Sequence, residues 1–292
     1  MLYVFLSICC SVIVSVLLKL ARRYQIDIFQ AIVWNYSMAI LLTWWFFKPD
    51  VKEIAFSQLP VWLYLVVGIL LPLIFWIMAA SVRVAGIVRT DVAQRLSLFI
   101  SLFAAFLLFG DSFSLARLAC FAIGFAAILC SIPWQKQTAN RKVVSNAWIY
   151  LILVFLGFGA IDISFKKVAS YTVVPYTTSL FYIYILAFVI SFISLLIKIF
   201  AGKARIHWAH IMFGWILGVA NFGNILFYLK AHKALSTSPS LVFSAMNIGV
   251  ITLGAIVGMV VFHERLSKLN KLGLALAIIS ITMITIVNIL HW

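Results

Sequence analysis

Charged side chains are scarce in this sequence. Only 10% of the residues are Asp, Glu, Lys or Arg, whereas 65% are hydrophobic and the mean hydropathy is +1.17. Soluble domains carry about a quarter charged residues, so this composition excludes a soluble globular protein. The apolar sequence is more than one core could bury, and we interpret the chain as an integral membrane protein.

Acidic residues are the rarest charged type, with seven against 22 Lys and Arg. The acids are scattered, without an HExxH or DxxxD cluster, whereas membrane enzymes need grouped acids, metal ligands or an activated nucleophile. We therefore predict no enzymatic activity, no metal and no cofactor. The basic residues lie mostly between apolar runs, where they face lipid headgroups, so a nucleic-acid partner is not expected.

Cysteine is also sparse. All four cysteines lie in apolar runs without the spacing of a metal site, and no disulfide framework is expected. We interpret them as small buried hydrophobic residues.

Long apolar runs dominate what is present. A run of about 20 apolar residues crosses a bilayer as a helix. The longest polar stretch has five such runs before it and five after it. We predict an all-α polytopic membrane protein with a first five-helix repeat at 1–133, a linker at 134–146 and a second repeat at 147–292. The predicted helices cover 2–20, 30–47, 61–82, 88–109, 115–133, 147–168, 176–199, 209–231, 237–262 and 268–290.

The two halves share a short motif. Residues 109–114 read FGDSFS and residues 262–267 read FHERLS, each between two apolar runs. We interpret Asp111 and Glu264 as turn and capping residues, with Ser114 and Ser267 as N-caps of the following helices. Because five helices per repeat is an odd number, the second repeat enters the membrane from the opposite side. Such inverted repeats are common in secondary transporters.

The second half also resembles a known family. The stretch KALSTSPSLVFSAMNIGVITLGAIVGMVVFHERLS (233–267) is similar to the EamA-type repeat of the drug/metabolite transporter superfamily. It departs from that repeat at His263, where Gly is usual, and in the first repeat at Asp111 and Ser112, which replace Glu and Arg. The resemblance implies a ten-helix permease or exporter that moves small metabolites by alternating access, and it supplies no catalytic residues.

Polar residues recur on one face of two predicted helices, where they predict a cavity, because polar groups in lipid face other helices or water. The alternative for these faces is a packing seam, which suits the Ser positions and the GxxxG pairs Gly214–Gly218 and Gly254–Gly258, whereas deep amides exceed what packing needs. The candidate cavity residues on these faces are Asn221, Asn224, Tyr228, Ser244 and Asn247.

Charged residues inside the apolar runs provide further candidates. Arg95 follows Asp91 by one helical turn, with Gln94 beside it. Asp91 either locks Arg95 in place or leaves it for an anionic substrate. Asp162 lies deep in its run, with Lys166 one turn later. It is either a proton-coupling site or half of a structural ion pair, because a charged carboxylate at that depth is costly without a partner.

These features favour a secondary transporter in the bacterial cytoplasmic membrane, as a monomer or homodimer. The excess of Lys and Arg favours an anionic or zwitterionic metabolite such as an amino acid. The alternative is a flippase or carrier for a lipid-linked or nucleotide-linked sugar. Orientation stays open: the Lys and Arg distribution places both termini outside, whereas relatives of the resembled superfamily have cytoplasmic termini.

Overall fold

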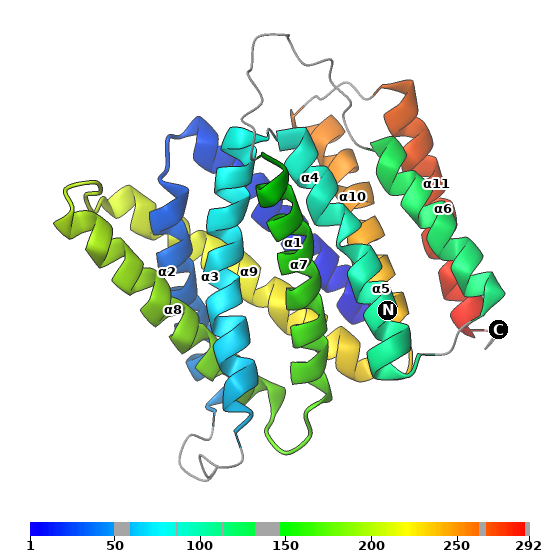
Figure 1. The fold of residues 1–292 in the computed structure, drawn as a ribbon, viewed down its shortest axis with the longest axis horizontal. Helices are drawn as coiled ribbons and strands as arrows, with labels where there is room; N and C mark the ends of the chain where they lie inside the picture. Colours follow the sequence, from blue (N-terminus) through cyan, green and yellow to red (C-terminus); the bar gives the residue numbers. More distant parts are fainter. Residues whose placement is uncertain (50–58, 86, 112–113, 132–146, 263–266, 290–292) are drawn as a thin grey trace.

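The computed structural model describes residues 1–49, 59–85, 87–111, 114–131, 147–262 and 267–289, and over these residues it is all-helical (Figure 1). The predicted linker at 134–146 and Glu264 lie outside the described residues. The helices are α1 (Leu2–Arg23), α2 (Ile28–Phe47), α3 (Val61–Val84), α4 (Ile87–Leu96), α5 (Leu98–Phe109), α6 (Leu115–Ser131), α7 (Ala147–Ser170), α8 (Tyr176–Phe200), α9 (Trp208–Ala234), α10 (Pro239–Phe262) and α11 (Lys268–Ile289).

Each predicted run coincides with a helix except the fourth. The run at 88–109 is divided at Ser97 into α4 and α5, which corrects the prediction of one continuous helix. Ser97 is buried, and its Oγ donates to the carbonyl oxygen of Gln94 at 2.5 Å. A side chain that bonds a carbonyl one turn back competes with the helical backbone ladder, which accounts for the break.

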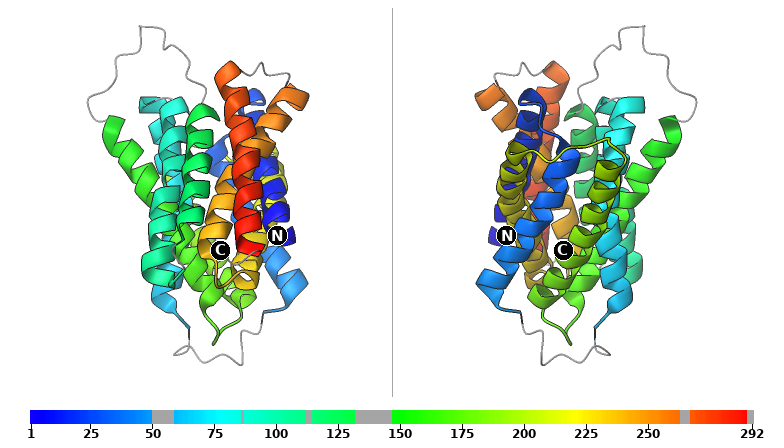
Figure 2. Two further views of the ribbon diagram at one scale, coloured as in Figure 1. Left: turned by 90° about the vertical axis from the view of Figure 1, so that its right-hand side faces the viewer. Right: turned by 90° about the vertical axis from the view of Figure 1, so that its left-hand side faces the viewer.

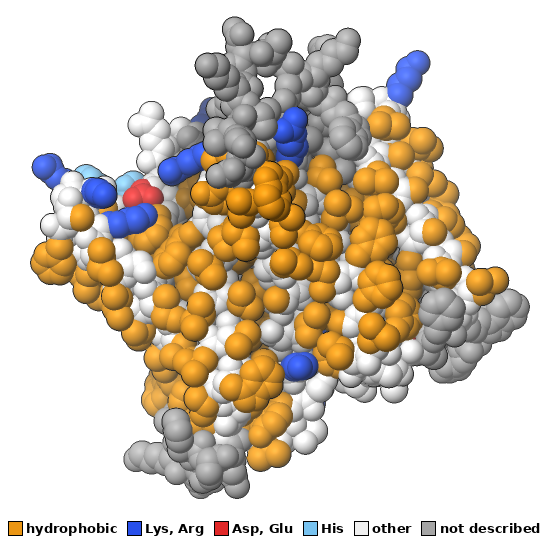
Figure 3. All heavy atoms as spheres, viewed as in Figure 1, with side chains coloured by type: hydrophobic (Ala, Val, Ile, Leu, Met, Phe, Trp, Pro, Cys, Tyr) orange, Lys and Arg blue, Asp and Glu red, His pale blue; other side chains and the backbone are white. Residues whose placement is uncertain are grey.

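Seven helical segments are long and apolar enough to cross a membrane, counting only the described part of the chain. The chain is therefore a multi-pass membrane protein, as the composition predicts. Figure 3 shows a broad belt of hydrophobic side chains, with Lys and Arg gathered along its upper edge. Such a belt matches a hydrocarbon core, and such an edge matches a headgroup layer. The segments are Leu2–Ala21, Val61–Val84, Val92–Phe109, Ala147–Ser170, Tyr176–Phe200, Trp208–Ala234 and Pro239–Val261.

Helices that are distant in sequence form the main contacts of the bundle. Helices α6 and α11 lie side by side at one edge, and α2 packs on α8 at the opposite edge (Figures 1 and 2). Helix α9 packs on both α1 and α2, and α3 packs on both α7 and α8. The first and second halves of the chain are thus interleaved rather than placed beside each other as separate bodies.

The first GxxxG pair lies at a close helix contact. A Cβ atom at Gly214 would lie 2.6 Å from both the carbonyl oxygen of Ala31 and the Cβ of Trp34 in α2. A Cβ at Gly218 would lie 2.7 Å from the carbonyl oxygen of Asn35. Real Cβ atoms do not approach so closely, so these glycines are what lets α9 reach the backbone of α2.

The second GxxxG pair is different at its first member. No atom lies within 4 Å of a Cβ built at Gly254 in α10. The predicted close contact at Gly254 is therefore wrong. The motif is only permissive, because small residues bring helices together only where a partner helix is placed over them.

The two glycines provide a matched test of the packing. Gly218→Ala should destabilise the protein by about 1–3 kcal/mol, because the added methyl group overpacks a contact made by backbone atoms. Gly254→Ala should be tolerated, since there is open space around it and Ala favours a helix by about 1 kcal/mol over Gly. Thermal unfolding of both purified variants in detergent measures the difference. Equal unfolding midpoints would contradict the α2–α9 contact.

Candidate functional site

The carboxylate of Asp162 is the centre of the candidate site. It lies on α7, about 12 Å before the end of that helix at 1.5 Å per residue. Its Oδ2 accepts a hydrogen bond from Ser101 Oγ on α5 at 2.8 Å, and its Oδ1 accepts one from Tyr228 Oη on α9 at 2.9 Å. Ser101 is completely buried and Tyr228 is nearly so. Two neutral hydroxyl groups from different halves of the chain therefore hold an acid inside the bundle.

His232 extends this network without a hydrogen bond. It follows Tyr228 by one turn of α9, and its ring centroid lies 4.6 Å from that of Tyr228 and 4.7 Å from that of Phe243 on α10. The side chain is 0% exposed, and neither ring nitrogen has a hydrogen-bond partner. Buried polar groups nearly always have partners, so an exception calls for a functional explanation. We call Ser101, Asp162, Tyr228 and His232 the interior polar cluster.

Lys166 lies one turn after Asp162 on α7 but bonds to different groups. Its Nζ donates to the carbonyl oxygens of Ser236 at 3.2 Å and His232 at 3.5 Å, at the end of α9. The side chain is only 2% exposed. A cation beside the last carbonyl groups of a helix stabilises its C-terminus. This geometry is that of a helix cap.

Asp111 makes the complementary contact on the next helix. Its Oδ2 accepts hydrogen bonds from the backbone N–H of Ser240, at 2.9 Å, and from the Ser240 hydroxyl, in the first turn of α10. Asp111, predicted as a turn and capping residue, thus caps α10. Lys166 and Asp111 also attract each other electrostatically. Together these two residues, which we call the turn clamp, hold the connection between α9 and α10.

The two serines predicted as N-caps, Ser114 and Ser267, both stand immediately before a helix. Ser267 Oγ accepts the backbone N–H of Asn270 at 3.2 Å, which confirms the predicted N-cap of α11. Ser114 precedes α6, and its carbonyl oxygen accepts the N–H of Leu118 at 3.0 Å.

The predicted amides and Ser244 lie in different environments. Ser7 Oγ on α1 lies 2.9 Å from both the carbonyl oxygen and Oδ1 of Asn224. Asn247 Nδ2 instead donates to Phe243 in its own helix, at 3.0 Å. Asn221 is buried on α9. Ser244 is completely buried on α10, and its Oγ lacks a hydrogen-bond partner.

The charged start of the fourth run lies beside α7. Gln94 and Arg95 are half-buried on α4, which packs against the helix that carries Asp162. Thr90 and Ser81 share a 2.7 Å hydrogen bond between α4 and α3. The side chain of Asp91 lies outside the described residues, so the predicted choice between an Asp91–Arg95 lock and anion binding stays open.

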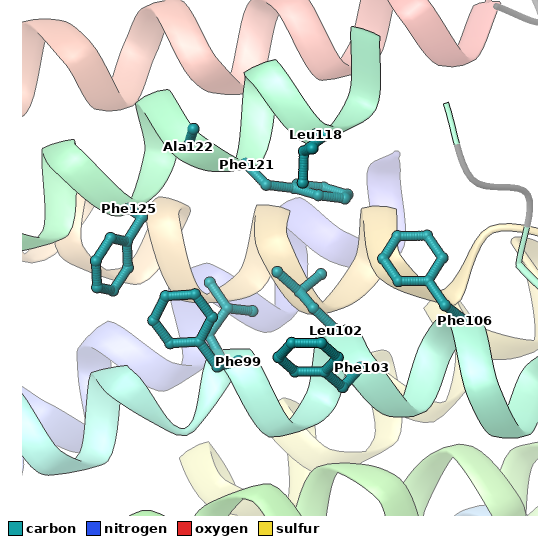
Figure 4. A pocket seen from close by; sticks show the side chains of 9 residues that line it. Phe99, Leu102, Phe103, Phe106, Leu118, Phe121, Ala122 and Phe125 are labelled. Atoms are coloured by element: carbon teal, nitrogen blue, oxygen red, sulfur yellow. The ribbon is translucent and has the colours of Figure 1, made fainter. Parts of the chain in front are cut away.

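An apolar cleft of about 300 Å³ separates α5 from α6. Figure 4 shows phenylalanine rings from both helices facing each other across it. Its lining offers no side-chain donor or acceptor, so it cannot select a polar metabolite. The lining residues are Leu98, Phe99, Leu102, Phe103, Phe106, Leu118, Phe121, Ala122 and Phe125.

Comparison with known proteins identifies relatives. No protein-family model matches the sequence. An uncharacterized protein of Haemophilus influenzae is 44% identical over 287 residues, which cover 94% of each chain. The chain belongs to the family of this Haemophilus protein. A solved structure described as "Crystal structure of protein" is 14% identical, with a TM-score of 0.73 over 98% of this chain and 96% of that one. At that identity the likeness shows a shared fold.

Ser101 and His232 are not among the predicted site residues. A sequence signal for both exists. His232 continues the three- and four-residue steps of Asn221, Asn224 and Tyr228, and Ser101 lies about two turns after Gln94. The sequence pattern does not reveal the hydrogen-bond partner of Ser101, because that partner, Asp162, lies 61 positions later.

Two buried tyrosines test the hydrogen bond to Asp162. Tyr228→Phe should destabilise the protein by about 1–3 kcal/mol, because a half-buried carboxylate oxygen loses its donor. Tyr184→Phe on α8 should be neutral or stabilising, because the Tyr184 hydroxyl is buried without a partner. Thermal unfolding in one detergent compares the two variants, which remove the same atom. A larger loss in Tyr184→Phe would contradict the assigned network.

Proposed function

We propose that this protein is a secondary transporter of a small anionic or zwitterionic metabolite, such as an amino acid, working by alternating access. The observation that carries the proposal is the Asp162 carboxylate, held inside a bundle of membrane helices by hydroxyl groups from both halves of the chain. Ionisable residues inside a membrane protein mark substrate pathways or proton relays.

Ten membrane spans in two inverted repeats form part of this proposal. Helices α2, α6 and α11 complete the set, because each packs beside a helix that is long and apolar enough to span. The pairing of helices supports a two-fold relation between α1–α6 and α7–α11. The contacts that α9 makes with α1 and α2 correspond to those that α3 makes with α7 and α8. The contact between α1 and α10 corresponds to that between α7 and α5. The contacts of α2 with α8, of α5 with α10 and of α6 with α11 each join two equivalent helices of the two halves.

An EamA-type permease of the drug/metabolite transporter superfamily is the family that we propose on the 233–267 motif. In inverted-repeat transporters the substrate binds near the midplane, between the repeats. The contact between Ser101 in one half and Asp162 in the other supports a substrate region at the interior polar cluster. His232 and Ser244, buried without hydrogen-bond partners, are suited to bind substrate or water in a conformation that opens this region. Asn221, with Gln94 and Arg95 on α4, completes the proposed substrate contacts.

Proton coupling through Asp162 follows from its partners. Both are neutral donors, so the carboxylate accepts two hydrogen bonds only while it is ionised. A proton on the acid turns one acceptor into a donor, which alters the bonds that join α5, α7 and α9. Protonation is thereby linked to contacts between the halves, as a coupled transporter requires. Lys166, engaged in the turn clamp, is left to a structural role.

Asp162→Asn tests this coupling. Asn is nearly isosteric and keeps an acceptor oxygen, so the variant should fold, while its pH-driven uptake into reconstituted vesicles should be lost. Substrate exchange without a pH gradient should survive. The matched control is Tyr184→Phe, which should transport like the unmodified protein. Undiminished pH-driven transport by folded Asp162→Asn would refute the coupling role.

The apolar cleft between α5 and α6 is the observation that favours the second candidate, a flippase or carrier for a lipid-linked or nucleotide-linked sugar. Its phenylalanine-rich lining is suited to an acyl or prenyl chain. The cytoplasmic membrane of a bacterium is the proposed location for either candidate, with a monomer or homodimer as the working unit.

Competition in vesicles separates the two candidates. Soluble amino acids or organic anions should inhibit transport, because Arg95 and the hydrogen-bonding groups of the interior polar cluster are the proposed contacts. A short-chain lipid-linked sugar and a permanently cationic dye should each have little effect. Inhibition by the lipid-linked sugar alone would replace the first proposal by the second, and inhibition by the dye alone would overturn both.

A further inference from the structure

A second cavity lies at the end of the bundle where α1 and α8 begin and α9 ends. Its volume is about 250 Å³, and Tyr3, Tyr176, Lys230, Lys233 and Ala234 line it. Lys233 is exposed, whereas Lys230 and Tyr176 are half-buried. Two lysines one turn apart therefore face one small space, and no acidic side chain is among its described lining residues.

Aromatic rings hold both ammonium groups in place. Lys230 Nζ lies 5.7 Å from the ring centroid of Tyr3 and 6.0 Å from that of Phe227. Lys233 Nζ lies 5.3 Å from the ring centroid of Tyr176. A ring face attracts an ammonium group without accepting its three N–H bonds in full, so donors remain for a ligand. Capping of α9 by cations explains a lysine in its last turn, but it does not explain why two lysines share a tyrosine-walled cavity.

The cavity is separate from the interior polar cluster. At 100° per residue, Lys230 and Lys233 lie about 140–200° around α9 from Tyr228, so they face away from Asp162. A ligand here would contact the ends of α1, α8 and α9 without reaching the proposed substrate region. Ligand binding would therefore affect how the ends of these three helices pack together.

We propose that this cavity is a binding site for a phosphate oxyanion. Lysine binds phosphate as a point charge, and two lysines facing one cavity can approach two oxygens of the same phosphate group. The helix ends place the site at the membrane surface, where basic pockets between helices bind phospholipid headgroups. The phosphate comes either from an anionic lipid headgroup or from a soluble phosphate, and the two sources are separable by experiment.

The test compares two double variants of the full-length protein. Lys230→Gln/Lys233→Gln removes the proposed site. Lys167→Gln/Lys198→Gln removes the same charge from two lysines that also lie over rings, those of Trp62 and Phe29, but do not line this cavity. Native mass spectrometry measures retained phosphatidylglycerol against phosphatidylcholine of the same chains. Thermal unfolding in detergent measures protection by inorganic phosphate.

We expect phosphatidylglycerol binding to fall about fivefold for each lysine removed from the cavity, and to change less than about twofold in the control. Protection by inorganic phosphate that is lost in the same variant, without lipid selectivity, would instead identify a soluble phosphate as the ligand. An equal loss in both double variants, or no difference between the cavity variant and the unmodified protein for either probe, overturns the site. If the double variant does not fold, exposed Lys233 is replaced alone, and unchanged binding then overturns it.

Discussion

Hydrogen bonds between the two halves, formed away from water, are the constraint on which the rest of the structure depends. Ser101 bonds Asp162, Asp111 bonds Ser240, and in the same way Ser7 pairs with Asn224, Tyr64 with Ser179, and Ser280 with the carbonyl of Cys120. Hydrocarbon offers no alternative partner for such groups. Each bond therefore sets the register of one helix against a helix from the other half, which lipid-facing Leu and Phe contacts do not specify.

Helix α9 carries most of this organisation. Its glycines allow it to lie against the backbone of α2, and its Asn224 faces α1. One turn further, Tyr228 reaches Asp162 on α7, and the turn clamp holds the end of the helix. Close packing at one end and polar contacts at the other hold α9 rigidly, and at the polar end the His232 ring has no hydrogen-bond partner. A fixed helix with an unsatisfied buried ring suits the substrate contact proposed for His232, because binding then supplies a missing bond instead of breaking one.

Neutral donors matter for the chemistry proposed at Asp162. An acid paired with a buried cation would be held ionised, and separating the pair would be strongly destabilising. Hydroxyl groups instead tolerate both protonation states, since each is donor and acceptor. A buried cation does lie nearby, but it has other partners: Lys166, on the same face of α7, is bonded to carbonyl groups at the end of α9. Lys166 thus caps a helix, whereas Asp162, one turn earlier, belongs to the interior polar cluster.

The sequence by itself determined the membrane class, the positions of the helices and the polar faces of α9 and α10. These follow from composition and from a local period, and local signals are visible in a single chain. Tertiary structure alone decided that α4 and α5 separate at Ser97, that Asp111 caps α10, that Lys166 bonds the end of α9, and that Gly218 but not Gly254 meets a neighbouring backbone. Each of these depends on which helix lies opposite. In lipid, apolar faces match almost any neighbour, so the choice of partner rests on a few buried polar and glycine positions whose mates are far away in the sequence.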